Sequence, residues 1–208
     1  MGMLAKAKRT AEEIEKPTFG RAGDVREWVW ATLMRERQVA YPLPPRGHHP
    51  NFRGAGEAAA RLVGYLLEHA YLSPGDCVIS YPDYVLKPLR KNLLEAGVSV
   101  VVPAKYGGAY RFLDAGKVPA KGGSSIAGAE RHGELITVLP TFRMAFLACV
   151  AVSEQGDVLD KGYGFRLPEP LRTLPSATLA HPLQRFKTLP EHTARVGFYA
   201  LPTQVWQK

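Results

Sequence analysis

The stretch CVISYPDYVLKPLRKNLLEAGVSVVVP, residues 77–103, decides the fold of this chain. It begins with a short apolar run, Cys77 to Tyr81, and ends with a valine-rich run, Val98 to Pro103. Runs of this kind are typical of strands that helices cover on both faces. Apolar residues between them recur at helical spacing up to Gly97: Leu86, Leu89, Leu93 and Ala96. The order strand, helix, strand predicts a βαβ unit with parallel strands and a right-handed crossover.

Regular patterns continue on both sides of this unit. Helical spacing predicts a helix over residues 24–38, with Asp24 as its N-cap, and a second helix over residues 54–71. Apolar runs predict further strands over residues 110–113, 135–139, 147–152, 176–181 and 196–201. These elements predict an α/β fold, a three-layer domain with a largely parallel central sheet flanked by helices. We expect a polar N-terminal segment over residues 1–20 and a single domain over residues 21–208.

The composition limits the classes of function. The chain has 208 residues and a formal net charge of +8, which suits phosphate-bearing partners, RNA among them, but equally suits a solvated basic surface. No run approaches the roughly 20 apolar residues of a membrane span, and the first residues lack the apolar core of a secretory signal. Cys77 and Cys149 lie in apolar runs, as buried free thiols do. We therefore expect a cytoplasmic protein without a membrane partner, either a monomer or a weak homodimer.

The loop Lys161-Gly162-Tyr163-Gly164 is the strongest candidate for a phosphate-binding element. Glycines let backbone N–H groups approach and converge on a phosphate, and Lys161 adds positive charge. The same short pattern also occurs in ordinary turns, so spacing alone leaves both interpretations open.

Three other features have a functional and a structural interpretation. His48 and His49, in a proline-rich loop, could contact a ligand or pack within their own loop. Asp83 follows a parallel strand, where α/β sheets place ligands, and is equally suited to cap a helix. Residues 106–112 interleave aromatic and basic side chains, as in a stacking surface for a pterin or a base, or as in a β-turn with cross-strand aromatics. Arg90 and Lys91 are interpreted as a solvated helix face. His48 and His49 are neighbours in the sequence, which is not the spacing of metal ligands.

Residues 150–165, which end in the Lys161 loop, resemble the C-terminal motif of the 5-formyltetrahydrofolate cyclo-ligase family. The segment His48-His-Pro-Asn-Phe-Arg-Gly-Ala55 is similar to Ile-Pro-Asn-Phe-x-Gly-Ala of one branch of that family, the methenyltetrahydrofolate synthase domain-containing proteins. Tyr81-Pro-Asp83 falls where this branch carries Asn-Pro-Asp. The resemblance extends over roughly residues 21–206.

This resemblance implies a reaction and a set of site residues. Family members use ATP and Mg²⁺ to convert 5-formyltetrahydrofolate into 5,10-methenyltetrahydrofolate through a phosphate ester of the formyl oxygen. Nucleotide binding is then expected from the loop Lys161–Gly164 together with Arg21 and Arg26. Substrate contacts are expected from Phe165, Asp83 and His48. Asp160 is the expected metal ligand.

The chain departs from the family motif at several charged positions. Val158 stands in place of the motif arginine, and Asp160 replaces the first glycine of the loop. Arg166 and Leu167 stand where the family has its second tyrosine and its aspartate. Lost or reversed charges in a phosphate site weaken transition-state stabilisation. Two main hypotheses follow: an ATP-dependent cyclo-ligase with a degraded catalytic motif, or a non-catalytic nucleotide-, folate- or RNA-binding module on the same fold. A different ligase or phosphotransferase reaction on this scaffold is a third, because fold does not fix function.

Overall fold

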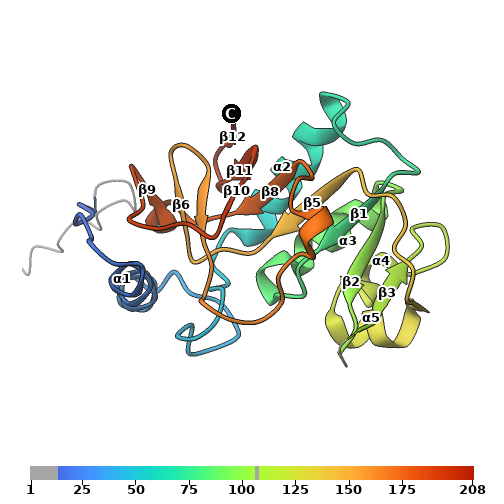
Figure 1. Cartoon of the computed structure of the whole chain (residues 1–208), viewed down its shortest axis with the longest axis horizontal. Helices are drawn as coiled ribbons and strands as arrows, with labels where there is room; N and C mark the ends of the chain where they lie inside the picture. The colour runs from blue at the N-terminus through green and yellow to red at the C-terminus, as the bar shows by residue number, and fades with distance from the viewer. Residues whose placement is uncertain (1–13, 106–107) are drawn as a thin grey trace, which may run out of the picture.

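The stretch that decides the fold forms the centre of the molecule in a computed structural model, which describes residues 14–105 and 108–208 (Figure 1). Strand β1 (Cys77–Ser80) pairs in parallel with β2 (Ser99–Pro103), and helix α3 (Lys87–Glu95) connects them. The predicted βαβ unit is therefore confirmed. Pro88 lies in the first turn of α3, where its missing N–H costs no hydrogen bond, and Gly97 follows the helix with a φ of +78°.

A large mixed sheet extends from this unit in both directions. Its strand order is β12-β11-β8-β5-β1-β2-β3-β4. The further strands are β3 (Tyr110–Leu113), β4 (Glu134–Ile136), β5 (Met144–Leu147), β8 (Ser176–Leu179), β11 (Phe198–Ala200) and β12 (Val205–Gln207). Pairing is parallel from β11 through β8, β5 and β1 to β2, and antiparallel at both edges. A central sheet flanked by helices confirms the predicted α/β class.

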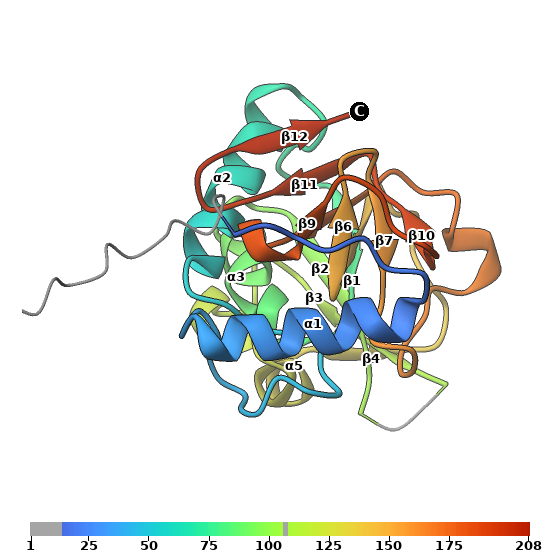
Figure 2. The same ribbon diagram turned by 90° about the vertical axis from the view of Figure 1, so that its left-hand side faces the viewer.

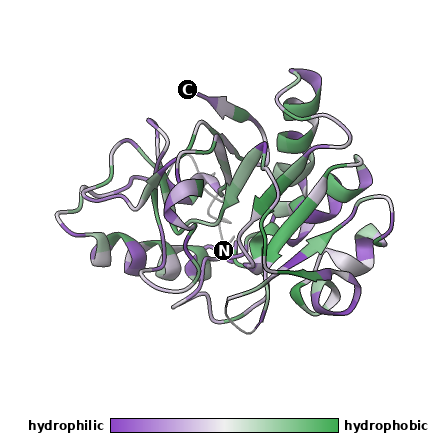
Figure 3. Cartoon of the chain, turned by 45° about the vertical axis from the view of Figure 1, so that its right-hand side comes forward, coloured by the Kyte–Doolittle hydropathy of each residue, from purple (hydrophilic) through white to green (hydrophobic). Residues whose placement is uncertain are grey.

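Helices pack on this sheet through small and branched apolar side chains. Helix α2 (Ala55–Glu68) buries a stripe at helical spacing, which includes Ala58, Leu62 and Leu66, against the sheet and α3. Figure 3 shows that the strands of the large sheet are mostly hydrophobic. The short helices α4 (Ala120–Gly123) and α5 (Ile126–His132) pack against each other, with α4 beside α3 and α5 beside β3. They were not predicted, because their glycine-rich sequence has no apolar periodicity. No helix among the described residues is both long enough and apolar enough to span a bilayer.

A second, smaller sheet was not predicted as a separate unit. It has the order β10-β7-β6-β9 and consists of β6 (Ala151–Ser153), β7 (Asp157–Leu159), β9 (Arg185–Phe186) and β10 (Ala194–Arg195). Its residues alternate between two cores. Ala151 and Leu159 pack with helix α1 (Ala22–Arg35), whereas Val152 and Val158 join the core of the large sheet. Helix α1 therefore lies over the small sheet (Figure 2).

The predicted strand over residues 147–152 was wrong, because these residues belong to two sheets. Strand β5 ends at Leu147, and β6 begins at Ala151. The intervening residues are as buried as the strands, so no polar residue marks the break. Asp24 was also wrong as a helix cap. It lies inside the first turn of α1 and pairs with Arg21 at 3.2 Å.

Three short 3-10 helices complete the described elements: η1 (Tyr84–Leu86), η2 (Glu169–Leu171) and η3 (Pro182–Gln184). The first of them directly follows β1, so Asp83 stands at the carboxyl end of a central parallel strand. The glycine loop leaves β7 and passes over this same end of the sheet, where Lys161 meets Asp83. The topology thus brings two of the predicted site segments together.

Candidate functional site

Asp160, at the start of the glycine loop, lies at the centre of a cluster of donors. Arg26 of α1 donates through Nε to the backbone carbonyl of Asp160 at 2.7 Å, and Arg26 Nη2 lies 3.5 Å from Oδ1 of Asp160. The N–H of Gly162 donates to the same Oδ1 at 2.7 Å, and Arg166 Nη2 lies 3.3 Å from Oδ2. The Asp160 side chain is only 12% exposed. Two guanidinium groups and a glycine N–H are the donors that hold an anion in many proteins, and here the chain's own carboxylate occupies them.

This environment does not suit Asp160 as a ligand of Mg²⁺. Its two carboxylate oxygens already face guanidinium groups and a backbone N–H, and a divalent cation between two arginines would be repelled. Within residues 14–105 and 108–208, no three His, Cys, Asp or Glu side chains converge on a possible metal position. Asp160 therefore fits the role of an internal counter-ion.

Asp83 joins the end of β1 to the glycine loop through His49. Nδ1 of His49 lies 2.8 Å from Oδ1 of Asp83, and Nε2 of His49 accepts the backbone N–H of Lys161 at 3.2 Å. The Lys161 ammonium lies 3.6 Å from the same Oδ1. Burial alone would raise the pKa of Asp83, but the hydrogen bond from His49 and the charges of Lys161 and Arg90 bring it below its ordinary value. The carboxyl group makes no helix-capping hydrogen bond, contrary to the capping interpretation.

Arg90 supports this corner from inside the protein. Its guanidinium donates to the carbonyls of Tyr81 and Asp83 at 2.8 and 3.2 Å, and to that of Ser124 at 2.7 Å. The Arg90 side chain is buried, so its interpretation as part of a solvated helix face was wrong. Lys91 lies on the exposed side of the helix, where it pairs with Glu95. Burial lowers the pKa of Arg90 to about 10, which leaves it charged at neutral pH.

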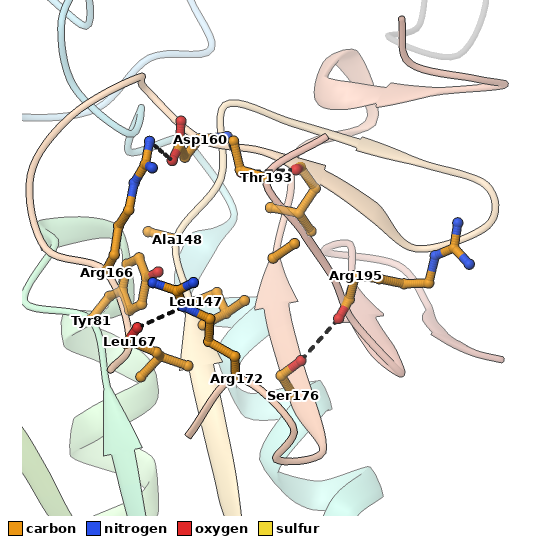
Figure 4. A pocket seen from close by; sticks show the side chains of 12 residues that line it. Tyr81, Leu147, Ala148, Asp160, Arg166, Leu167, Arg172, Ser176, Thr193 and Arg195 are labelled. Carbon is orange, nitrogen blue, oxygen red and sulfur yellow. Dashed lines mark hydrogen bonds and ion pairs between the residues drawn. The ribbon is translucent and has the colours of Figure 1, made fainter. Parts of the chain in front are cut away.

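Two hollows meet at the Tyr81–Phe165 pair, whose rings contact edge to face with centroids 5.1 Å apart. The first is a pocket of about 170 Å³ (Figure 4). Polar and basic side chains line one part of it: Tyr81, Asp160, Arg166, Arg172, Ser176 and Thr193. Arg195 also lines it, but its guanidinium points away from the pocket and pairs with Asp157. The second is a groove of about 340 Å³ with a mainly apolar lining, which includes Pro82, Tyr110, Ile126 and Phe165.

The glycine loop has the backbone that its sequence requires, but two of its N–H groups are already engaged. Gly162 and Gly164 adopt φ values of +96° and +99°, which favour glycine. The N–H groups of Lys161 and Gly162 bond to His49 and Asp160. The Tyr163 hydroxyl donates to the Gly47 carbonyl, and the Lys161 ammonium lies 5.1 Å from the centre of the Tyr163 ring. Phosphate binding by this loop stays a prediction.

The structure brings some of the predicted site residues together and leaves others apart. It brings Arg26, Asp83, Asp160 and the loop Lys161–Phe165 together. Arg21 lies outside this cluster, with its side chain 80% exposed and paired with Asp24. The His48 side chain is exposed, and its backbone makes the local contacts: the carbonyl accepts the Trp30 indole N–H, and the N–H donates to the Pro45 carbonyl. Of the segment 106–112, residues 106 and 107 lie outside the described residues, and Tyr110 lies in an antiparallel strand, as in the cross-strand interpretation.

The sequence indicated His49, with His48, as a possible ligand contact, but its bonds to Asp83 and Lys161 and the buried position of Arg90 were missed. One signal pointed to His49: the similar family segment carries isoleucine at this position, which indicates a buried site. Arg90 had no such signal, because an arginine in an amphipathic helix is usually exposed.

The fold and this site define an α/β protein with a charged cluster and two hollows at the end of its central strands. The fold is similar to the NMR structure of 5,10-methenyltetrahydrofolate synthetase from Aquifex aeolicus, with a TM-score of 0.52 and 16% sequence identity. The match covers 89% of this chain and 92% of that chain. The fold expected from the resemblance is thus confirmed, and at this identity the likeness concerns the fold alone. No protein-family model matches the sequence, and neither does any curated protein.

Proposed function

We propose that this chain binds a ligand with a flat ring and an anionic tail, of the reduced-folate or nucleotide class. We propose further that it acts mainly by binding this ligand and converts it slowly or not at all. The observation that carries the proposal is the Tyr81–Phe165 pair, which has a basic pocket on one side and an apolar groove on the other. Such a pair of hollows suits a ligand whose ring stacks on aromatic side chains and whose phosphates or carboxylates face arginine.

The residues assign roles to the two ends of this ligand. In the groove, Phe165 and Tyr110 offer aromatic faces and edges to a pterin or a base. In the pocket, Arg166 has a side chain that is 56% exposed, so its guanidinium can turn from Asp160 to an incoming anion. Lys161, with a less exposed side chain, keeps its ammonium near Asp83.

Cyclo-ligase turnover is the second candidate, and the fold similarity to a methenyltetrahydrofolate synthetase favours it. In the family reaction, ATP supplies the activating phosphate and Mg²⁺ accompanies the nucleotide. Here a phosphate beside Arg26 and Arg166 would meet the carboxylate of Asp160, and two negative charges in a partly buried site repel each other. Arg26 and Arg166 can bind and orient a ligand, but the charge of Asp160 opposes phosphoryl transfer at this position.

Two measurements on the same folded preparation test the proposal. Calorimetry with ATP, 5-formyltetrahydrofolate and a short RNA is expected to give saturable binding of ATP or of the folate. An absorbance assay with protein, ATP, Mg²⁺ and 5-formyltetrahydrofolate is expected to show little or no ATP-dependent formation of methenyltetrahydrofolate. If the chain binds neither ATP nor 5-formyltetrahydrofolate, the proposal is wrong. Rapid ATP-dependent turnover would show that the chain is a cyclo-ligase and would contradict the claim that it acts mainly by binding. Binding of RNA alone would favour a nucleic-acid-binding module, and such binding should weaken at high salt.

A further inference from the structure

His49 connects three segments that are distant in the sequence. It belongs to the proline-rich loop, its Nδ1 lies 2.8 Å from Asp83 at the end of β1, and its Nε2 accepts the N–H of Lys161 at 3.2 Å. The side chain is 2% exposed. Because Nε2 accepts a hydrogen bond, the proton of the neutral ring lies on Nδ1 and is donated to the Asp83 carboxylate. Both ring nitrogens are thus used, and each one bonds to a different segment of the candidate site.

The other groups around His49 favour this arrangement. The Asp83 carboxylate is held from the other side by the Lys161 ammonium at 3.6 Å, and the Asp83 carbonyl accepts from buried Arg90 at 3.2 Å. Tyr81 is the nearest titratable ring, with centroids 6.4 Å apart. Arg26 and Arg166 hold Asp160, the residue directly before Lys161. A protonated His49 would bring a second N–H against the N–H of Lys161, and two donors cannot bond to each other.

We propose that His49 is a positioning residue: its neutral ring fixes the glycine loop at Lys161 against Asp83, and its protonation releases the loop. The claim about the loop is independent of any ligand. Its consequence for affinity rests on the proposed function, because only a fixed loop presents Lys161 and Arg166 to an anion in one geometry.

Amide hydrogen exchange at Lys161, followed by NMR in the full chain, tests the loop directly. The protection factor, which corrects for the intrinsic effect of pH on exchange, is expected to be high while His49 is neutral. It should fall under conditions in which the ring's own NMR signals report a protonated His49. His49→Leu is expected to lower the protection of Lys161 about tenfold at neutral pH, as the loss of one hydrogen bond would. His49→Gln, whose amide carries both a donor and an acceptor, is expected to restore part of the protection without this pH dependence.

His48→Leu is the matched control, because the neighbouring side chain is exposed. It is expected to leave the protection of Lys161 and its pH profile unchanged. If His49→Leu folds and Lys161 stays protected, or if protection in the unsubstituted chain does not follow the protonation of His49, the proposal is wrong. A second readout is calorimetry with ATP, where His49→Leu should weaken binding about tenfold. If the unsubstituted chain binds no ATP and no folate, the proposed function fails, but the exchange experiment still decides the role of His49.

Discussion

Arg26 and Asp160 are 134 residues apart in the sequence, yet Arg26 Nε donates to the Asp160 carbonyl at 2.7 Å. The same guanidinium lies 3.5 Å from the carboxylate, so one side chain of α1 holds both the backbone and the side chain of the loop residue. The position of Asp160 thereby depends on how α1 packs over the small sheet. Through this relationship the N-terminal helix becomes part of the candidate site.

Replacement of Arg26 by Met is expected to lower the free energy of unfolding by about 1–3 kcal/mol, because a part-buried carbonyl and carboxylate lose a charged donor. Chemical denaturation measures this change. Arg21→Met is the matched control: Arg21 is in the same part of the chain, but its pair with Asp24 is exposed. The control should change stability by less than about 0.5 kcal/mol. Equal effects of the two substitutions would show that the Arg26–Asp160 contact does not hold the loop.

Removal of the charge of Asp160 is expected to strengthen anion binding. Asp160→Asn keeps the size of the side chain, and its amide oxygen can still accept the Gly162 N–H, while Arg26 and Arg166 lose a competing anion. We expect the Kd for ATP or tripolyphosphate, measured by calorimetry, to decrease by on the order of tenfold. Asp114→Asn, which removes a carboxylate paired with Lys117 in another part of the chain, should leave this Kd unchanged. Unchanged or weaker binding by Asp160→Asn would contradict the view that the carboxylate occupies an anion position.

Buried Arg90 is expected to be essential for stability. Arg90→Met removes the charged donor from three carbonyl groups. Those of Tyr81 and Asp83 keep the Ser80 hydroxyl and the Leu86 N–H, whereas the buried bond to Ser124 is lost. We expect a loss of about 3–5 kcal/mol, or a decrease in Tm of roughly 10 °C, in a thermal unfolding experiment. Lys91→Met, at the next position of the same helix, should have little effect, because the Lys91–Glu95 pair is exposed. A small decrease for Arg90→Met would mean that other groups can satisfy these carbonyls.

The sequence predicted those parts of the structure that depend on local periodicity. The apolar runs around Val78 and Val100, with the helix between them, predicted the parallel pair at the centre of the sheet. The small sheet escaped prediction because its strands are two or three residues long and its residues alternate between two buried cores. Neither feature leaves the alternation of polar and apolar residues that marks a half-exposed strand.

The site was predicted in part, for a physical reason of the same kind. The glycines at 162 and 164 require unusual φ values, which their sequence context shows. His49 contacts Asp83 and Arg90 contacts Ser124, each 34 residues away, and such pairings have no local pattern. Choosing between His48 and His49 required the three-dimensional structure, because adjacent residues in a loop differ in burial without any periodicity.

His181 is expected to make the protein less stable in mild acid. The ring is buried, and its Nδ1 accepts the N–H of Leu183 at 3.2 Å. Burial, with a smaller effect of the Lys16 charge, lowers the pKa of His181 to about 4. Because the unfolded chain takes up a proton near pH 6.5 and the folded chain only near pH 4, stability should decrease as the pH falls through this window.

Urea denaturation between pH 7 and pH 4 measures this effect, which we expect to reach about 2–3 kcal/mol. His181→Asn should reduce the pH dependence in this window, because the amide oxygen can accept the Leu183 N–H but does not titrate. His132→Asn, at an exposed position, should leave the pH dependence as it is. If His181→Asn folds and shows the same loss of stability between pH 6.5 and pH 4 as the unsubstituted chain, then His181 does not exclude its proton in the folded state, and the acid sensitivity arises from other groups.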